Sequence, residues 1–298
     1  MNILVSGASG LIGSALVPEL EAAGHSVRRL VRREQNSSVE VPWRTDMLQP
    51  AAVEPFHAVI HLAGRNVGTR WSGRVKREIW TSRVDGTRTV ATAVAEAFRR
   101  TGRPEVFVSA SAVGYYGSRG EEELTEGSSS GTGFLAEVSR GWESATQPAA
   151  EAGLRVAIPR IGVVLTRRGG ALKKMLLPFQ MGLGGPIGSG RQWMSWIVLE
   201  DLVRVLASTL TEARLTGPFN AVAPHPVMNR EFVQALGAVL HRPAAFPLPA
   251  FVVKTLFGEM GKETLLASGR VIPEKLNQIG FSFGHPEIVE ALQYAART

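Results

Sequence analysis

The chain has 298 residues, of which 44% are hydrophobic and 20% charged, with six histidines, no cysteine and a net charge of +7 at pH 7. This length and composition are typical of a soluble globular protein with one large α/β domain or two unequal ones. The absence of cysteine excludes disulfides, thiolate metal sites and cysteine nucleophiles. The histidines are scattered, so we expect no metal site.

No apolar stretch reaches the roughly 18 residues that a membrane helix needs, and the N-terminus starts with a strand instead of a leader. We therefore expect a cytoplasmic protein with no membrane partner. The positive charge raises the question of nucleic acid, but arginines and lysines are dispersed in short groups such as Arg99-Arg100. We expect no nucleic-acid partner, and a basic surface suited to anionic small molecules.

The first element is a strand, glycine turn and helix. The apolar run Ile3 to Val5 precedes SGASGLIG, and a helix is expected over Leu11 to Ala23. In such a unit the helix N-terminus and the backbone amides of the turn bind a pyrophosphate, which glycine allows to approach closely. The spacing of the glycines is a variant of the dinucleotide fingerprint. We therefore predict that the turn binds a dinucleotide, through Gly7, Ser9, Gly10, Leu11, Ile12 and Gly13.

Strands and helices then alternate. Further strands are predicted at 25–31, 39–43, 57–64, 105–111 and 154–160, and helices at 80–100 and about 134–151. This order predicts an α/β fold, a Rossmann-type doubly wound parallel sheet whose ligand lies at the C-terminal edge of the strands.

After Thr166 glycines and prolines become frequent and the alternation stops. We predict a dinucleotide-binding domain over 1–165, completed by elements from about 195–225, and a smaller substrate-binding region over 166–298. The polar stretch 121–133 is expected to be a mobile loop beside the site.

The end of the second strand predicts which dinucleotide is bound. An acidic residue there binds the ribose 2′-hydroxyl of NAD, whereas arginine accommodates the 2′-phosphate of NADP. This chain has Arg32 and Arg33, which predict NADP(H), although paired arginines also occur on ordinary basic surfaces. Asp46 could accept a hydrogen bond from adenine, and the small residues after the fourth strand would let the backbone pass under the ribose, namely Leu62, Ala63 and Gly64.

The chain resembles the extended short-chain dehydrogenase/reductase superfamily, on the motifs GASGLIG (7–13), HLAG (61–64), RVDGT (83–87) and SASAVGYYG (109–117). More narrowly it resembles an atypical branch of epimerase-like, NADP-dependent oxidoreductases, some of whose bacterial members are labelled cell-division inhibitors. The segments 70–87, 176–197 and 241–260 carry that resemblance. The resemblance implies NADP(H), a substrate of nucleotide-sugar type and, in many members, a homodimer.

The superfamily uses a tyrosine and a lysine four residues apart to exchange the proton that accompanies hydride transfer. None of the three tyrosines here has a lysine at that spacing, because the residues four beyond them are Arg119, Gly120 and Thr298. On the expected helix the pair aligns with Phe134 and Val138, or with Leu135 and Ser139, none of which exchanges protons as a tuned tyrosine does. The dyad is absent.

Two interpretations remain open. In one, Tyr115 or Tyr116, close to Ser111, supplies a substitute acid, so these three are the candidate catalytic residues. In the other, redox chemistry is lost and the protein is a catalytically silent nucleotide sensor or regulator. Packing of the tyrosine rings, and a hydroxyl of Ser111 that only caps a turn, are the structural alternatives.

Other arginines follow predicted strands or occur in RVDGT. Arg83 stands where the superfamily usually has asparagine, and it could bind cofactor phosphate or ribose; Glu78, on the same helix, would orient it. Arg160 ends the sixth strand and could contact nicotinamide or substrate. In the second region Arg191, Gln192, Trp193 and Trp196 are the candidate substrate-binding residues, although the tryptophans can equally belong to the core.

Overall fold

The structure is a computed structural model that describes residues 1–32, 34 and 36–297. Its centre is one sheet in the order β12-β8-β5-β4-β1-β2-β3, with β6 also paired with β8, and every pairing in it is parallel. Its strands are β1 (Asn2–Ser6), β2 (Ser26–Val31), β3 (Glu40–Pro42), β4 (Ala58–His61), β5 (Val106–Ser109), β6 (Ser111–Ala112), β8 (Arg155–Ile161) and β12 (Gly217–Ala221). The predicted doubly wound α/β fold is confirmed.

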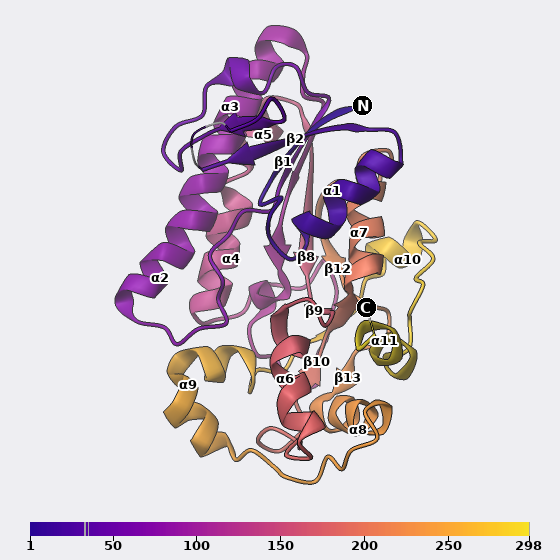
Figure 1. The fold of residues 1–298 in the computed structure, drawn as a ribbon. Helices are drawn as coiled ribbons and strands as arrows, with labels where there is room; N and C mark the ends of the chain where they lie inside the picture. The colour runs from indigo at the N-terminus through magenta and orange to yellow at the C-terminus, as the bar shows by residue number, and fades with distance from the viewer. Residues whose placement is uncertain (33, 35, 298) are drawn as a thin grey trace.

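Helices cover both faces of this sheet (Figure 1). On one face α1 (Gly13–Ala22) packs against α7 (Leu199–Ser208), and on the other α3 (Gly86–Thr101) packs against α5 (Gln147–Glu151). Successive residues of each strand point to opposite faces, which gives two apolar cores on either side of the sheet. The polar residues that form the candidate site lie at the C-terminal ends of the central strands.

The long helix after β4 begins earlier than predicted. Its first part, α2 (Gly73–Trp80), is capped by Ser72, whose Oγ accepts a hydrogen bond from the amide of Val75 at 3.3 Å. Only Ile79 of this segment is buried, so its mostly polar sequence offers few apolar residues from which to predict a helix. Ser72 is the cap that could have indicated the earlier start.

A π-helical turn, η2 (Thr81–Asp85), joins α2 to α3 without a break in the helix. π-helical turns are rare and frequent at functional sites. The predicted helix 134–151 is two helices, α4 (Phe134–Ser144) and α5, because Pro148 lacks an amide proton and occupies the first turn of a new helix.

The second region packs around its own apolar core below the C-terminal edge of the sheet (Figure 1). Short strand pairs lie around this core: β9 (Val163–Leu165) with β11 (Trp196–Val198), and β10 (Trp193–Met194) with β13 (Val227–Met228). A third pair, β7 (Glu123–Leu124) with β14 (Arg270–Val271), links the C-terminal part of the chain to the sheet domain. Its helices are α6 (Gly170–Gln180), α8 (Asn229–Val239), α9 (Ala250–Thr264), α10 (Glu274–Gln278) and α11 (Ile288–Ala295). Within the described ranges, every helix is too short or too polar to cross a bilayer.

Candidate functional site

The glycine turn, residues 7–13, is packed too tightly for larger side chains. Gly7 has a φ of 69°, and a Cβ there would lie 2.8 Å from the carbonyl carbon of Leu62. A Cβ on Gly13 would lie 2.3 Å from the carbonyl oxygen of Gly7. The glycine turn leads directly into α1. No side chain caps the N-terminus of this helix, and its first helical turn contains no acidic residue. Such an end favours an anion.

The other residues of the glycine turn differ in exposure. Ser9 and Gly10 are exposed, whereas Leu11 and Ile12 are half-buried. The side chain of Leu11 packs against Gly169, where an added Cβ would lie 2.9 Å from its Cδ1. The side chain of Leu11 therefore ties the turn to the second region.

A cavity of about 620 Å³ opens beyond the end of β2. Three arginines and two aspartates contribute to its wall, and its lining residues are Arg32, Trp43, Arg44, Thr45, Asp46, Thr81, Asp85, Arg88 and Thr89. The position of Arg32 agrees with its predicted role at the 2′-phosphate end of a dinucleotide. Arg33 lies outside the described residues.

Asp46 lies in the same cavity wall but is paired. Its carboxylate accepts hydrogen bonds from Nε and Nη2 of Arg44, each at 3.1 Å, and the bonds from Arg44 lower the pKa of Asp46. The carboxylate is exposed at the cavity edge.

A row of polar residues crosses the central strands at the floor of the site. Ser6 Oγ lies 2.7 Å from Nδ1 of His61 and accepts hydrogen bonds from the amides of Leu62 and Ala63 at 3.2 and 3.3 Å. The hydroxyl of Ser6 and the ring of His61 thus share a buried hydrogen bond, while Nε2 of His61 has no partner among the described residues. Burial, aided by the charge of Arg32, lowers the pKa of His61 to about 4.

Arg83 lies in η2 under the loop that follows β4. Its guanidinium lies 5.0 Å from the ring of Trp142, and a Cβ on Gly64 would lie 3.2 Å from its Cζ. Gly64 is therefore small because the arginine passes beneath it. Burial lowers the pKa of Arg83 to about 10. Among the described residues its one hydrogen bond is a 3.5 Å contact to the carbonyl of Ile79.

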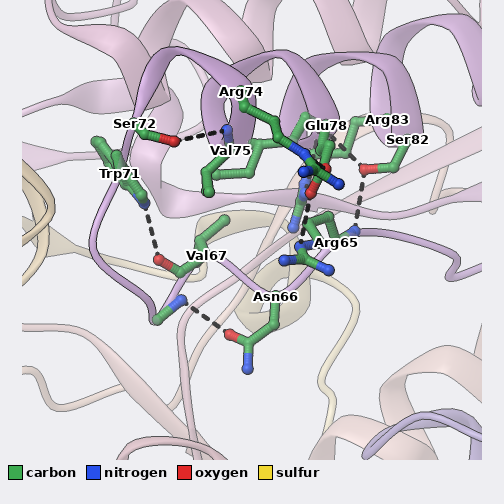
Figure 2. A network of polar contacts seen from close by, with 12 residues as sticks. Arg65, Asn66, Val67, Trp71, Ser72, Arg74, Val75, Glu78, Ser82 and Arg83 are labelled. Atoms are coloured by element: carbon green, nitrogen blue, oxygen red, sulfur yellow. Dashed lines mark hydrogen bonds and ion pairs between the residues drawn. The ribbon is translucent and has the colours of Figure 1, made fainter.

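The expectation that Glu78 orients Arg83 is wrong. Figure 2 shows Glu78 directed to two other arginines, Arg74 at 2.9 Å and Arg65 at 3.4 Å. The reason is helix geometry, because Arg74 stands four residues before Glu78 on the same helix face whereas Arg83 follows after five residues and a π-helical turn. Arg83 is thus left without a carboxylate partner in the described part of the chain.

A buried ion pair lies where the sheet meets α4. Nε of Arg160 donates to Oε1 of Glu143 and Nη2 donates to Oε2, both at 2.8 Å, and Oγ of Ser111 donates to Oε1 at 2.7 Å. Burial disfavours the charged form of Arg160, but the hydrogen bonds and charge of Glu143 outweigh it and raise the pKa of Arg160. Arg160 is 3% exposed and committed to Glu143, so the structure does not support its predicted contact with cofactor or substrate.

Tyr116 is part of the same network and is fully buried. Its hydroxyl donates to Oδ1 of Asn220 at 2.7 Å and accepts from Nη1 of Arg160 at 2.9 Å. Burial raises the pKa of Tyr116 to about 12, against the opposing effect of Arg160. The structure contradicts a role for Tyr116 as catalytic acid and supports the packing alternative.

Tyr115 is different. Its half-buried ring stacks on the guanidinium of Arg160, with Cζ 3.5 Å from the ring centroid, and meets Tyr116 edge to face. The phenol hydroxyl forms no hydrogen bond within the described ranges. Of the two tyrosines after β6, Tyr115 is therefore the one whose hydroxyl proton is not donated to another described residue.

The helix α4, on which the superfamily has its tyrosine and lysine, begins with two residues whose backbone amides bind a carboxylate. The amides of Phe134 and Leu135 donate to the two carboxylate oxygens of Glu263, each at 2.9 Å. Glu263 lies on α9, so the C-terminal segment caps the N-terminus of α4. Val138 and Ser139 are buried in the same helix and offer no exposed proton donor.

The four substrate-binding candidates are not brought together as expected. Trp196 is fully buried, and its Nε1 donates to the carbonyl of His225 at 3.1 Å, so it belongs to the core and is not a stacking surface. Gln192 is 8% exposed and its amide donates to two backbone carbonyls, so it holds the chain together. Arg191 is exposed and pairs with Glu121. Trp193 is half-buried, with Arg270 over its ring.

Sequence reasoning missed Glu143, Glu263 and the two further arginines of the cavity, Arg44 and Arg88. Both glutamates lie on helices, where acidic residues are usually solvated. The spacing of Glu143 from Phe134 on α4 could have shown only that it lies on the same helix as the vacant dyad positions.

Two sequence models match the chain. One, described as the NAD dependent epimerase/dehydratase family, matches residues 3–222, and the other, described as a domain of unknown function (DUF1731), matches residues 248–295. An epimerase family protein of Mycobacterium tuberculosis is 44% identical over 296 residues, which cover 98% of this chain and 97% of that protein.

Solved structures are similar over the whole chain. Human epimerase family protein SDR39U1, crystallised with NADPH, superposes with a TM-score of 0.91 at 35% identity and covers 100% of both chains. A nucleoside-diphosphate sugar epimerase from Corynebacterium glutamicum superposes with a TM-score of 0.81 at 35% identity, over 99% of this chain and 58% of that one. The chain belongs to the NAD dependent epimerase/dehydratase family.

Proposed function

We propose that this protein binds NADP(H) and acts as an oxidoreductase or epimerase-like enzyme of the extended short-chain dehydrogenase/reductase type. The observation that carries the proposal is the arginine-lined cavity beside Arg32, next to a glycine turn that tolerates no side chain at Gly7 or Gly13. A 2′-phosphate is the group that distinguishes NADP from NAD, and arginine is the side chain suited to it. The NADPH bound to human SDR39U1 adds support.

The residues present fit a dinucleotide. The turn and the start of α1 would hold the pyrophosphate, Arg32 with Arg44 and Arg88 would hold the 2′-phosphate, and Leu62 to Gly64 would underlie the ribose. Arg83 is half-buried and no carboxylate of the described residues neutralises it, so a phosphate or ribose oxygen would supply the partner that its guanidinium lacks there. We assign the dinucleotide unit to 1–165 with 195–225, and the substrate side to 166–298.

When bound, the nicotinamide supplies a hydride donor or acceptor at the carboxyl edge of the sheet. A proton must move with the hydride, and Tyr115 is the side chain that we assign to it, because its hydroxyl has no partner in the described structure. The guanidinium of Arg160 fixes the ring from one side. The proton would pass from the phenol oxygen of Tyr115 to a substrate oxygen in reduction, and return in oxidation.

Ser111 has a supporting role in this proposal. It is 2% exposed and its hydroxyl proton points to Glu143, so direct contact with a substrate is not supported in this conformation. Ser111 and Glu143 hold Arg160, and Arg160 holds Tyr115. These three are positioning residues.

The test is a screen for NADPH oxidation against carbonyl compounds, nucleotide-linked keto sugars included, with wild type, Tyr115→Phe and Tyr294→Phe as the matched control. We expect turnover that Tyr115→Phe lowers by roughly 100-fold or more and that Tyr294→Phe leaves unchanged. Retained turnover in Tyr115→Phe would remove Tyr115 from the proposal. NADPH binding without turnover on any compound would favour the silent nucleotide-binding protein instead.

A further inference from the structure

Large apolar side chains that face solvent are concentrated on one face of the second region. Six of them are between 56% and 71% exposed: Leu177, Met181, Leu183, Phe246, Phe251 and Leu256. The other exposed large apolar residues in the described ranges are far apart in the sequence and on other elements. Scattered apolar residues need no explanation, but a contiguous group marks an interaction surface.

Two segments form this face, 170–189 with α6 and 241–258 with the first part of α9. Hydrogen bonds join them side by side: the amide of Phe246 donates to the carbonyl of Gly184 at 3.0 Å, and that of Leu248 to Pro186 at 2.9 Å. Figure 1 shows α6 and α9 at the same end of the molecule, with the connecting chain running along that end. We call these two segments the basic apolar face.

The charge on this face has one sign. Neither segment contains aspartate or glutamate, whereas together they contain Lys173, Lys174, His241, Arg242 and Lys254. Lys173 and Lys254 are exposed and pair with no carboxylate in the described part of the chain. The first acidic residues after it are both paired: the exposed Glu259 with Lys76 at 2.8 Å, and Glu263 with the amides of α4. Exposed apolar side chains are thus combined with unpaired cations.

We infer that the basic apolar face docks on the headgroup layer of an anionic lipid membrane, with its apolar side chains inserted and its lysines on the phosphates. Peripheral proteins bind such surfaces by this combination of apolar burial and cationic attraction. A second copy of the chain is disfavoured as the occupant, because a two-fold contact would bring the same unpaired lysines together. This inference replaces the expectation of no membrane partner, and it does not depend on the proposed function.

Docking would also bring α4 close to the lipid surface, because α9 contributes to the face and contacts α4. Gly258 has a φ of 60° and divides α9 into two parts. The part before it carries Phe251 and Leu256 of the face, and the part after it carries Glu263, which caps α4.

The experiment is co-sedimentation of the full chain with vesicles of phosphatidylcholine alone or with phosphatidylglycerol, at low and at high salt. The variants are Leu177→Ser/Phe251→Ser for the apolar side chains and Lys173→Glu/Lys254→Glu for the charges. Matched controls are Met47→Ser/Val289→Ser, which removes exposed apolar side chains elsewhere, and Arg99→Glu on α3.

We expect binding to the anionic vesicles that salt weakens, and a fall of roughly tenfold or more in either face variant but in neither control. Absence of binding, or equal loss in the controls, would overturn the inference. So would a concentration-dependent dimer in sedimentation velocity that Leu177→Ser/Phe251→Ser abolishes, because the face would then be a contact between copies. All variants are at exposed positions, and circular dichroism would establish that they fold.

Discussion

Arg160 holds Glu143 through two parallel hydrogen bonds of 2.8 Å, and both side chains are almost fully buried. This pair joins β8 to α4, the helix on which related enzymes carry their tyrosine and lysine. It also fixes Ser111 and both tyrosines of the turn after β6. A structural ion pair therefore lies beside the positions on α4 where the superfamily would have its catalytic tyrosine and lysine.

Removing one partner of this pair should be costly. Glu143→Gln leaves Arg160 as a buried cation without its counter-charge, so we expect the free energy of unfolding to fall by about 3–5 kcal/mol. Chemical denaturation measures it, with Glu96→Gln on the exposed side of α3 as control. The double variant Glu143→Leu/Arg160→Met should be less destabilised than Glu143→Gln, because no charge is left buried. A loss below 1 kcal/mol in Glu143→Gln would mean that solvent reaches the pair.

Tyr116 should make stability depend on alkaline pH. Its pKa is raised from 10.0 to about 12 by burial, so the unfolded chain loses this proton first. The contribution of the protonated Tyr116 to the free energy of unfolding is complete below pH 10 and is lost as the pH rises towards 12. We expect wild type to lose more stability than Tyr116→Phe between these values, in denaturant titrations with Tyr294→Phe as control. Parallel curves for wild type and Tyr116→Phe would contradict the assignment.

His61 should act at the other end of the pH range. Its folded pKa of about 4 lies below the ordinary 6.5, so its contribution is present above pH 6.5 and is lost as the pH falls through 4. The shift corresponds to about 3 kcal/mol. His61→Leu should flatten the acid side of the stability profile, whereas His241→Asn, a surface change at a left-handed position that asparagine tolerates, should not. A profile unchanged in His61→Leu would refute this origin.

Much of the fold could be predicted from the sequence. Buried parallel strands are apolar runs, and the glycine turn needs its glycines for reasons local to residues 7–13, so β1, α1 and the parallel, doubly wound class of the sheet could be predicted from short-range pattern. The site residues proposed at the turn and at Arg32 rest on such local chemistry. The helix start at Gly73 was missed because α2 has a single buried residue.

Contacts between segments far apart in the sequence could not be predicted. In the sequence, Glu143 and Glu263 look like ordinary surface acids. They form buried or capping contacts only because α4 packs against β8 and α9 in the fold. From the sequence, Trp196 fits either the core or a binding surface, because a tryptophan beside short strands is found in both. Its complete burial in the structure assigns it to the core.

The contact between Glu263 and α4 should hold the C-terminal segment against the site. Glu263→Ala removes the acceptor for two amides at a helix N-terminus, so we expect a loss of about 1 kcal/mol and faster hydrogen exchange at Phe134 and Leu135. Glu290→Ala, on the exposed first turn of α11, is the control. Unchanged exchange at these amides would show that α4 is held without this cap.

The central claim is the preference for NADPH through Arg32, and calorimetric titration with NADPH and NADH tests it most directly. We predict tighter binding of NADPH by wild type, and a weakening of roughly 10- to 100-fold in Arg32→Ala that is specific to NADPH. Arg28→Ala, on the strand that precedes Arg32 but outside the cavity, should bind as wild type does. Equal binding of both nucleotides, or no effect of Arg32→Ala, would contradict the claim.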